Sequence, residues 1–300
     1  MRFMRVLLAV AIVAVLIWIY PPARLAALAV AGRSPACPIP NAIKADENLR
    51  LQIRYNEEII KASKLLETDT AGYQLWDTPA GRFWIPTGSR WVLPYNLAEQ
   101  KRRIYGNDQQ SARAGDIVLD CGANVGVTVR VWLAAGAKQV VAIEPAPENL
   151  ECLRRNFKDE IASGRVLIYP KGVWDKDEIM AMQIDPANSA ADSFIIHRQG
   201  STETRGIPLT TIDKLVPELK LDRVDFIKMD IEGAEPRALA GAKETIAKFH
   251  PRMALCTYHA PDHPKRIPEL VRAAWPGYTT ECGPCFEANH GVRPDVLYFH

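Results

Sequence analysis

The sequence predicts an α/β protein with a doubly wound, mostly parallel sheet. Two observations support this prediction. Short apolar runs alternate with helix-compatible segments between residues 116 and 274, which is the order that builds a parallel sheet with helices on both faces. The first run ends in Asp-Cys-Gly-Ala-Asn-Val-Gly at 120–126. A glycine-containing turn between a buried strand and a helix is typical of a cofactor-binding loop.

The core elements follow one another in order along the chain. Each expected strand is short and apolar, as strands buried on both faces are. Strands are expected at 116–119, 140–143, 166–169, 224–229 and 252–257, and helices at 125–135, 147–158, 236–248 and 265–274. An insertion at 171–219 holds shorter strand-like pieces, and 278–281 should pair with 296–299 as a closing antiparallel pair.

Ahead of this core, the chain divides into two further parts. We expect a membrane anchor or signal-like segment at 1–33, a helical and hairpin extension or lid at 34–110, and the main domain at 111–300. Within the extension, the composition and spacing predict a linker at 34–45, a helix at 46–67, a hairpin turn at 78–81 and a helix at 97–105.

The N-terminal segment is a strong signal of its own. Val6 to Tyr20 are 15 consecutive apolar residues behind Arg2 and Arg5. A helix of this length measures about 22 Å, which is less than the ~30 Å hydrocarbon core of a bilayer. We therefore expect membrane contact through residues 3–31 and an inner-membrane location. Spanning, surface binding and cleavage as a signal peptide remain open.

Composition and cysteine usage restrict the remaining classes. The formal net charge is +2 and no long basic run is present, so nucleic-acid binding is not expected. The six cysteines fall mostly inside expected strands and helices, which predicts reduced core thiols and a reducing compartment. Cys282-Gly-Pro-Cys285 lies in a turn-rich stretch and is interpreted as a loop, with a disulfide or metal role as the alternative.

The loop at 120–126 favours one nucleotide-like cofactor over another. A dinucleotide fingerprint, Gly-x-Gly-x-x-Gly, requires a third glycine for packing of the helix on the strand. The series here is Gly122, Asn124, Gly126, Val127, so that glycine is absent. Glu144 ends the next strand, 24 positions after Asp120, where a doubly wound fold places the carboxylate that holds a ribose diol. The hydrogen-bond donors of S-adenosylmethionine suit these acids. S-adenosylmethionine is the expected cofactor, and a nicotinamide-dependent dehydrogenase is the alternative.

A second acidic block, Phe226 to Glu235, ends the strand expected to be central. Asp230 lies at the strand end, where its carboxylate can orient a substrate hydroxyl or take its proton. Lys228 shares a strand face with Asp230 by period-two alternation and needs a charged partner if it is buried. Glu232 is a further candidate, and an acid here can instead stabilise the N-terminus of the following helix.

Two histidines follow the last parallel strand. His259 lies at the strand end and is a candidate general base, or a candidate ligand of a divalent metal together with Asp230. His263 is four positions further on, but Pro261 and Pro264 exclude the helix that would place both rings on one face. No metal is therefore assigned.

Three blocks of the chain resemble the FkbM family of S-adenosylmethionine-dependent methyltransferases. They are Val118-Leu-Asp-Cys-Gly-Ala-Asn-Val-Gly126, Ile143-Glu-Pro-Ala-Pro-Glu-Asn149 and Phe226-Ile-Lys-Met-Asp-Ile-Glu-Gly-Ala-Glu235. The resemblance implies the class I methyltransferase fold, a Rossmann-like seven-stranded sheet with a closing antiparallel C-terminal strand. It also implies O-methylation of a saccharide, a lipid-linked glycan or a small hydroxylated metabolite.

The resemblance further implies roles for individual residues. Asp230 becomes the favoured catalytic residue, assisted by His259 or Glu232. The expected cofactor-binding residues are Asp120, Gly122, Ala123, Asn124, Gly126, Glu144, Pro145, Gly172 and Val173. Because S-adenosylmethionine is held in the cytosol, the catalytic domain is expected on the cytoplasmic side. A non-catalytic binding module that keeps the fold is the remaining hypothesis, and the intact acids argue against it.

Overall fold

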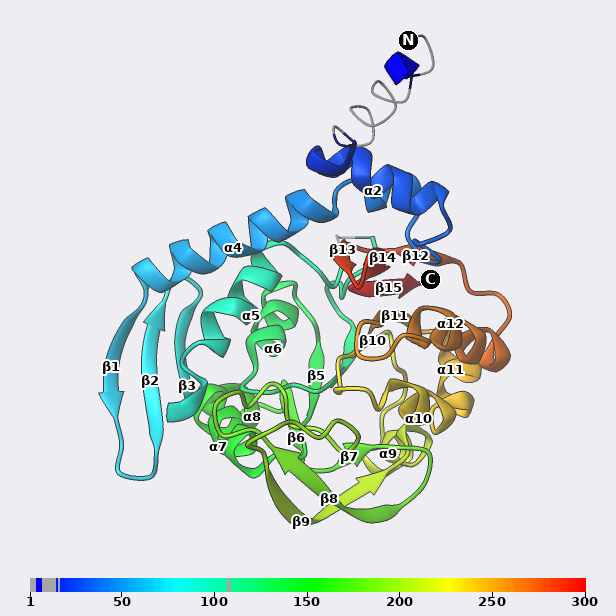
Figure 1. Cartoon of the computed structure of the whole chain (residues 1–300). Helices are drawn as coiled ribbons and strands as arrows, with labels where there is room; N and C mark the ends of the chain where they lie inside the picture. The colour runs from blue at the N-terminus through cyan, green and yellow to red at the C-terminus, as the bar shows by residue number, and fades with distance from the viewer. Residues whose placement is uncertain (1–3, 7–14, 16, 107–108) are drawn as a thin grey trace.

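The computed structural model describes residues 4–6, 15, 17–106 and 109–300, and its centre is a seven-stranded sheet (Figure 1). The strand order is β12-β15-β11-β10-β4-β5-β6. The strands are β4 (Ile117–Cys121), β5 (Gln139–Ile143), β6 (Val166–Tyr169), β10 (Phe226–Met229), β11 (Arg252–Cys256), β12 (Thr280–Cys282) and β15 (Val296–Phe299). All neighbours from β6 to β11 are parallel, and β15 is antiparallel to β11 and β12. The predicted sheet, including its closing antiparallel pair, is confirmed.

Helices cover both faces of this sheet because alternate residues of each strand face opposite sides. Leu119 and Ile227 belong to one core cluster, and Val118 and Phe226 belong to another. The helices are α6 (Val127–Ala134), α7 (Pro147–Asn156), α8 (Lys158–Ala162), α9 (Ile212–Glu218), α10 (Glu235–Ala240), α11 (Lys243–Phe249) and α12 (His263–Ala274). The single helix expected at 236–248 is divided at Gly241 into α10 and α11.

The order in which successive strands are added to the sheet changes direction between β6 and β10. From β4 the chain adds β5 and β6 on one side, and it then returns to place β10 on the other side. Asp120 of β4 is in register with Lys228 of β10. The carboxyl ends of the two strands therefore lie side by side, and this switch point is where open α/β sheets bind ligands.

An N-terminal layer packs beside the main sheet. It contains α4 (Ala45–Ala62), an antiparallel sheet of β1 (Lys64–Thr68), β2 (Tyr73–Thr78) and β3 (Gly81–Pro86), the 3₁₀ turn η1 (Thr87–Ser89) and α5 (Val92–Lys101). The predicted hairpin is confirmed by the β2–β3 pairing. The helix expected at 46–67 ends at Ala62, because the next residues pair with β2 as β1. Ile59 and Leu97 share a core cluster with Val127. The domain boundaries stay predictions.

The expected insertion forms a second small sheet. Its strands are β7 (Gly172–Val173), β8 (Glu178–Ile184) and β9 (Thr202–Thr210), in the order β7-β9-β8. Near the C-terminus, β13 (Cys285–Ala288) and β14 (Gly291–Pro294) form a hairpin.

The predicted inner-membrane localisation is contradicted. Among the described residues, no helix is both long enough and apolar enough to cross a membrane. Part of the stretch assigned to membrane contact folds as α2 (Pro21–Val30), and its Leu25 is fully buried in a cluster with Val292 of β14. This finding overturns the expected inner-membrane location. Residues 7–14 and 16 of the apolar run lie outside the described part of the chain.

The prediction of reduced cysteines is wrong for two residues. Cys37 and Cys285 form a disulfide across a sequence separation of 248. The expected linker around Cys37 also contains the short helix α3 (Ile39–Ala42), which packs against β13. Cys121, Cys152 and Cys256 are buried free thiols, as predicted. Pairing between cysteines this far apart depends on the tertiary fold, so cysteine spacing could not show it.

Candidate active site

The loop after β4 contains glycine where side chains would collide. Gly122 has a φ of 78°, and a Cβ there would lie 1.9 Å from the carbonyl oxygen of Asp230. The ends of β4 and β10 can approach this closely only because residue 122 has no side chain. Gly126 has a φ of 95°, and a Cβ there would lie 2.1 Å from the ring of Phe157. Both glycines therefore fix the loop by close packing within the chain.

Asp120 and Lys228 form a buried ion pair beneath this loop. Asp120 Oδ1 lies 3.3 Å from Lys228 Nζ, and Asp120 Oδ2 accepts hydrogen bonds from Thr128 at 2.6 Å and Trp132 at 3.0 Å. Lys228 also donates to the carbonyl of Gly122 at 2.7 Å. Burial alone would lower the pKa of Lys228, but Asp120 and Asp230 raise it to about 12. The pair supports the loop from below, and Asp120 lines neither of the two cavities described next.

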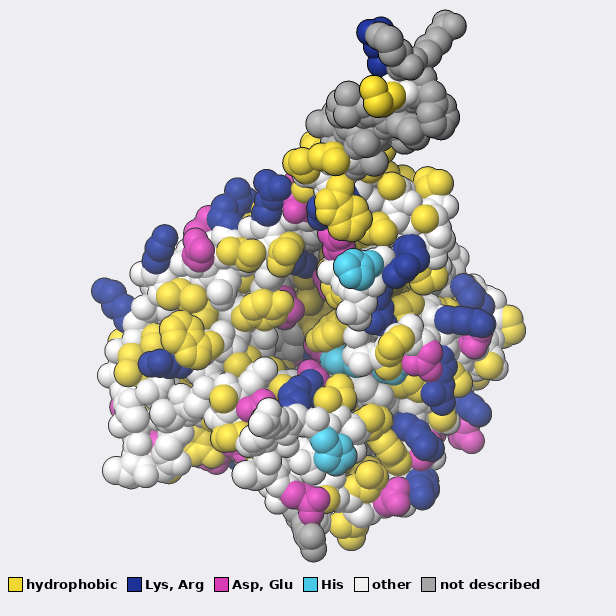
Figure 2. Space-filling model, in the orientation of Figure 1, with side chains coloured by type: hydrophobic (Ala, Val, Ile, Leu, Met, Phe, Trp, Pro, Cys, Tyr) yellow, Lys and Arg dark blue, Asp and Glu magenta, His cyan; other side chains and the backbone are white. Residues whose placement is uncertain are grey.

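Two cavities lie above the switch point. The larger, of about 390 Å³, is lined by α5, by the loop after β4 and by Asp230, Glu232 and Tyr258. Figure 2 shows a hollow near the middle of the side of the molecule that faces the viewer, with hydrophobic side chains around it and histidine and acidic side chains within it. The smaller cavity is about 50 Å³. Both cavities are lined by Gly122, Ala190, Asn124, Asp230 and Glu232, so they meet at the ends of β4 and β10.

The smaller cavity collects most of the predicted cofactor residues. Its lining includes Gly122, Asn124, Glu144, Pro145, Gly172 and Val173. Ala123 lines the larger cavity, and Gly126 lines neither. The Glu144 carboxylate accepts backbone hydrogen bonds from Asn124 at 2.8 Å and from Ala146 at 2.9 Å. Burial raises the pKa of Glu144 to about 7.

A segment between β8 and β9 closes the smaller cavity. The carbonyl of Ser189 accepts hydrogen bonds from Asn124 and Asn149, each at 2.9 Å, and the Ser189 amide donates to Ser89 at 3.0 Å. Two buried acceptors in this region, Asn124 Oδ1 and Asp192 Oδ2, have no hydrogen-bond partner among the described residues. Burial raises the pKa of Asp192 to about 8. The wall of this cavity thus offers acceptors that lack donors.

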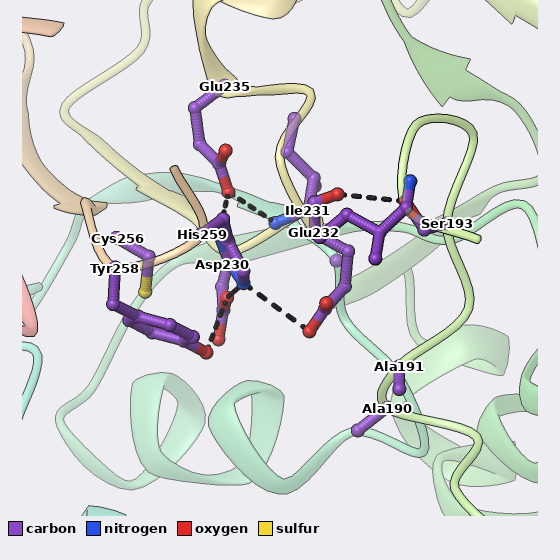
Figure 3. Close-up of polar contacts among 12 residues, drawn as sticks. Ala190, Ala191, Ser193, Asp230, Ile231, Glu232, Glu235, Cys256, Tyr258 and His259 are labelled. Carbon is purple, nitrogen blue, oxygen red and sulfur yellow. Dashed lines mark hydrogen bonds and ion pairs between the residues drawn. The ribbon is translucent and has the colours of Figure 1, made fainter. Parts of the chain in front are cut away.

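A carboxylate–histidine cluster follows β10 and β11; Figure 3 shows four of its members, Asp230, Glu232, Glu235 and His259, and His263 is the fifth. His259 Nε2 lies 3.5 Å from Asp230 Oδ1 and 3.4 Å from Glu232 Oε1. On the other side of the ring, His259 Nδ1 lies 2.9 Å from Glu235 Oε1, and His263 Nδ1 lies 3.5 Å from Glu235 Oε2. Glu232 has a φ of 53°, which is rare for a residue with a side chain. This backbone conformation places its carboxylate beside His259.

The charges of the cluster shift its pKa values in opposite directions. Burial alone would lower the pKa of His259, but Glu235, Glu232 and Asp230 raise it well above its usual value. Burial alone would raise the pKa of Asp230, but Lys228 and His259 lower it, with a hydrogen bond from Tyr105. Asp230 is therefore held as a carboxylate.

The structure adds residues that the sequence analysis did not select. Tyr105 donates to Asp230 Oδ2 at 2.8 Å, and Tyr258 donates to Asp230 Oδ1 at 3.2 Å. Arg198 donates to Glu232 Oε2 at 2.6 Å. Tyr258 follows a strand end and could have been selected by that rule. Nothing local marks Tyr105 or Arg198, because both reach the site from distant parts of the chain.

Lys228 and Glu235, both in the second acidic block, make contacts that the sequence did not specify. The charged partner closest to Lys228 lies on the neighbouring strand, at Asp120, rather than along its own strand at Asp230. Glu235 begins α10 and accepts a hydrogen bond from the Ile231 amide at 3.0 Å, yet its carboxylate also joins the two histidines. His259 and His263 thus both contact the Glu235 carboxylate, although they do not share a helix face.

Comparison with known proteins supports the family resemblance that the three sequence blocks indicate. A family model described as the methyltransferase FkbM domain matches residues 120–282. The 2-O-methyltransferase NoeI of Sinorhizobium fredii is 32% identical over 149 residues, which are 44% of this chain and 59% of that protein. The hexuronic acid methyltransferase AglP of Haloferax volcanii is 23% identical over 165 residues, covering 55% of this chain and 65% of that protein.

The matches are therefore partial in both directions, and the chain spans 59% and 65% of the lengths of these two relatives. A crystal structure of methyltransferase FkbM from Methylobacillus flagellatus superposes with a TM-score of 0.47 at 17% identity, covering 85% of this chain and 59% of that one. Because the family model matches more than half of the chain, this protein belongs to the FkbM methyltransferase family.

Proposed function

We propose that this chain transfers a methyl group from S-adenosylmethionine to a hydroxyl of a saccharide or another small hydroxylated acceptor. The observation that carries the proposal is the meeting of two cavities at Asp230 and Glu232. One cavity gathers the predicted cofactor residues, and the other has room for an acceptor. The relatives NoeI and AglP, described as a 2-O-methyltransferase and a hexuronic acid methyltransferase, support this acceptor class.

The smaller cavity fits the chemistry of the cofactor. Its unpartnered acceptors, Asn124 Oδ1 and Asp192 Oδ2, and the Glu144 carboxylate match a ligand rich in donors. S-adenosylmethionine has such donors in its ribose hydroxyls, its adenine amino group and its ammonium group. We assign the ribose to Glu144, the adenine to the wall that includes Val173, and the methionine part to the loop that includes Gly122. The segment that contains Ser189 must shift outward, because about 50 Å³ is too small for an adenosyl group.

The residues of the cluster orient the acceptor in this proposal. Methyl transfer is an in-line displacement at the sulfonium, so alignment of the two reactants supplies much of the rate enhancement. Asp230 is ionised and faces the larger cavity, where it accepts a hydrogen bond from the acceptor hydroxyl. As the new C–O bond forms and the S–C bond breaks, the hydroxyl proton passes to this carboxylate. The electron pair of the broken S–C bond stays on sulfur, which leaves S-adenosylhomocysteine.

Calorimetry with two cofactors tests the proposal. Titration of the full chain with S-adenosylhomocysteine should release heat at a single site, whereas titration with NADH should not. Incubation with S-adenosylmethionine and a set of saccharides, including hexuronic acids, should then add the mass of one methylene to an acceptor. Binding of NADH without binding of S-adenosylhomocysteine would instead support the dehydrogenase alternative.

A further inference from the structure

The geometry points to a divalent-cation site formed by His259 Nε2, Asp230 Oδ1 and Glu232 Oε1, with the remaining coordination positions open to the acceptor. The oxygens lie 3.5 Å and 3.4 Å from the nitrogen, and all three atoms lie within 4.8 Å of one another. Atoms that share one ion at about 2.1–2.2 Å are about 3.0–3.6 Å apart. Both nitrogen–oxygen distances are long for a hydrogen bond, and both match the spacing of two atoms that bind the same ion.

Asp230 and Glu232 each have their other oxygen engaged elsewhere, and Asp230 Oδ1 itself also accepts from Tyr258 at 3.2 Å. Asp230 Oδ2 accepts from Tyr105, and Glu232 Oε2 accepts from Arg198. His259 Nδ1 faces Glu235 Oε1 at 2.9 Å. A carboxylate behind a histidine ligand fixes the ring and makes its other nitrogen a better donor to a metal. The remaining three atoms therefore point toward one place, as Figure 3 shows for His259, Asp230 and Glu232.

The environment of His259 provides independent support. The side chain is 2% exposed, and Nε2 makes no hydrogen bond to any residue that the structure describes. A buried nitrogen that makes no hydrogen bond loses its hydration and recovers only the attraction of the nearby carboxylates. A cation at this place would supply the missing partner.

The surrounding charges also favour a cation. Asp230, Glu232 and Glu235 bring three carboxyl groups together; the side chain of Glu235 is fully buried, and those of Asp230 and Glu232 are 21% and 14% exposed. Lys228 is already paired with Asp120, and Arg198 is paired with the outer oxygen of Glu232. Apart from Arg198, only His259 among the described residues remains to offset the three carboxylates, and charge of one sign that is removed from water is costly without a counter-ion.

The ligand set indicates which cation fits. Carboxylates suit Mg²⁺ and Mn²⁺, while imidazole suits first-row transition metals, so one imidazole with two carboxylates favours Mn²⁺. Asp230 and Glu232 line the larger cavity, so an acceptor hydroxyl can occupy an open position of the ion. A bound cation lowers the pKa of a hydroxyl ligand. This role of the cation rests on the proposed function, whereas binding of the cation does not.

Titration with Mn²⁺ alone tests the inference. The chelator-treated full chain should take up one Mn²⁺, measured by loss of the electron paramagnetic resonance signal of the free ion. His259→Ala and Glu232→Gln should each weaken binding by at least about tenfold, and Glu235→Gln should weaken it by a similar factor or less. His290→Ala, which changes an exposed histidine in the β13–β14 turn, should bind Mn²⁺ like the wild type.

Two outcomes would overturn the cation site. One is a wild-type protein that binds S-adenosylhomocysteine but takes up no Mn²⁺ at millimolar concentration. The other is equal Mn²⁺ binding by the wild type, His259→Ala and Glu232→Gln, which would place the ion elsewhere. Binding of S-adenosylhomocysteine, measured on every variant, confirms folding and separates failure of the cation site from failure of the proposed methyl transfer.

Discussion

On the β4–β5 side of the site, each oxygen of Asp120 and Glu144 meets a partner from the chain, whereas on the β10–β11 side three carboxylates surround His259. Both sides are built from acids at strand ends. The first side determines the shape of the loop, and its atoms without a hydrogen bond, such as Asn124 Oδ1, are acceptors that a donor-rich ligand can use. The second side is left with surplus charge and a nitrogen that lacks a hydrogen bond. The difference suggests that the first side supports binding and that the second performs the chemistry.

The largest effect that separates the two sides should come from Asp230→Asn. This change removes the charge that we propose to orient the acceptor, while it keeps the shape of the side chain. Turnover should fall by about 10²–10⁴-fold, and the affinity for S-adenosylhomocysteine should stay within about threefold because the acceptors proposed to hold the cofactor, on Glu144, Asn124 and Asp192, are unchanged. Steady-state kinetics and calorimetry measure the two quantities. Turnover near the wild-type rate would remove Asp230 from the reaction.

Asp120→Asn should instead act on stability. It leaves Lys228 buried without its counter-charge, and breaking a buried pair costs about 3–5 kcal/mol. Chemical denaturation should show this loss in the free energy of unfolding. Glu58→Gln removes one partner of an exposed ion pair with Lys101 and should leave the stability almost unchanged. A destabilisation of Asp120→Asn no larger than that of Glu58→Gln would show that the pair does not support the loop.

The pH dependence of cofactor binding should report on Glu144. Since burial raises its pKa to about 7, the carboxyl ionises near neutral pH in the free protein. Ribose hydroxyls donate to the ionised form, so the affinity for S-adenosylhomocysteine should rise by about tenfold between pH 6 and pH 8. The stability that this group contributes has the opposite trend: it is complete below the unfolded pKa and is lost as the pH rises through about 7.

Glu144→Gln provides the control for this trend. The variant should bind S-adenosylhomocysteine more weakly at pH 8 and should lose the change in affinity with pH. Calorimetry in buffers of equal ionic strength gives both values. An unchanged pH slope in the variant would assign the titration to another group, and Asp192, whose pKa burial raises to about 8, would be examined next.

The smallest of these effects should come from Tyr105→Phe, which deletes one hydrogen bond to Asp230. A hydrogen bond of this kind contributes about 0.5–1.5 kcal/mol, so turnover should fall by about three- to tenfold. Because the hydroxyl helps to lower the pKa of Asp230, its loss should move the acidic limb of the kcat/KM profile to higher pH. A fall in turnover without that movement would indicate a packing role for the ring.

The sheet and its strand ends could be predicted from the sequence because they follow from local patterns. The apolar strands around Val118 and Val140 and the acids at Asp120, Glu144 and Asp230 all lie where the alternation of strands and helices places them. The direction in which each acid points could not be predicted in the same way. Asp120 turns inward because Lys228 lies opposite it on β10, and cross-strand register is not a local property.

Contacts between distant segments account for the remaining errors. The disulfide between Cys37 and Cys285 depends on how the N-terminal segment packs against the β13–β14 hairpin. The membrane contact expected for residues 3–31 included Leu25, yet Leu25 of α2 is buried against that same hairpin. As predicted, no helix contains both His259 and His263, and it is Glu235, distant in sequence, that lies next to both rings. Apolar or histidine content alone does not reveal which surface a segment covers.

A crystal structure with bound S-adenosylhomocysteine tests the central claim most directly. We predict ribose hydroxyls within hydrogen-bond distance of Glu144 and a sulfur atom that faces Asp230 and Glu232 where the two cavities meet. A complex in which the ribose lies away from Glu144, or in which the sulfur points away from Asp230, would contradict it.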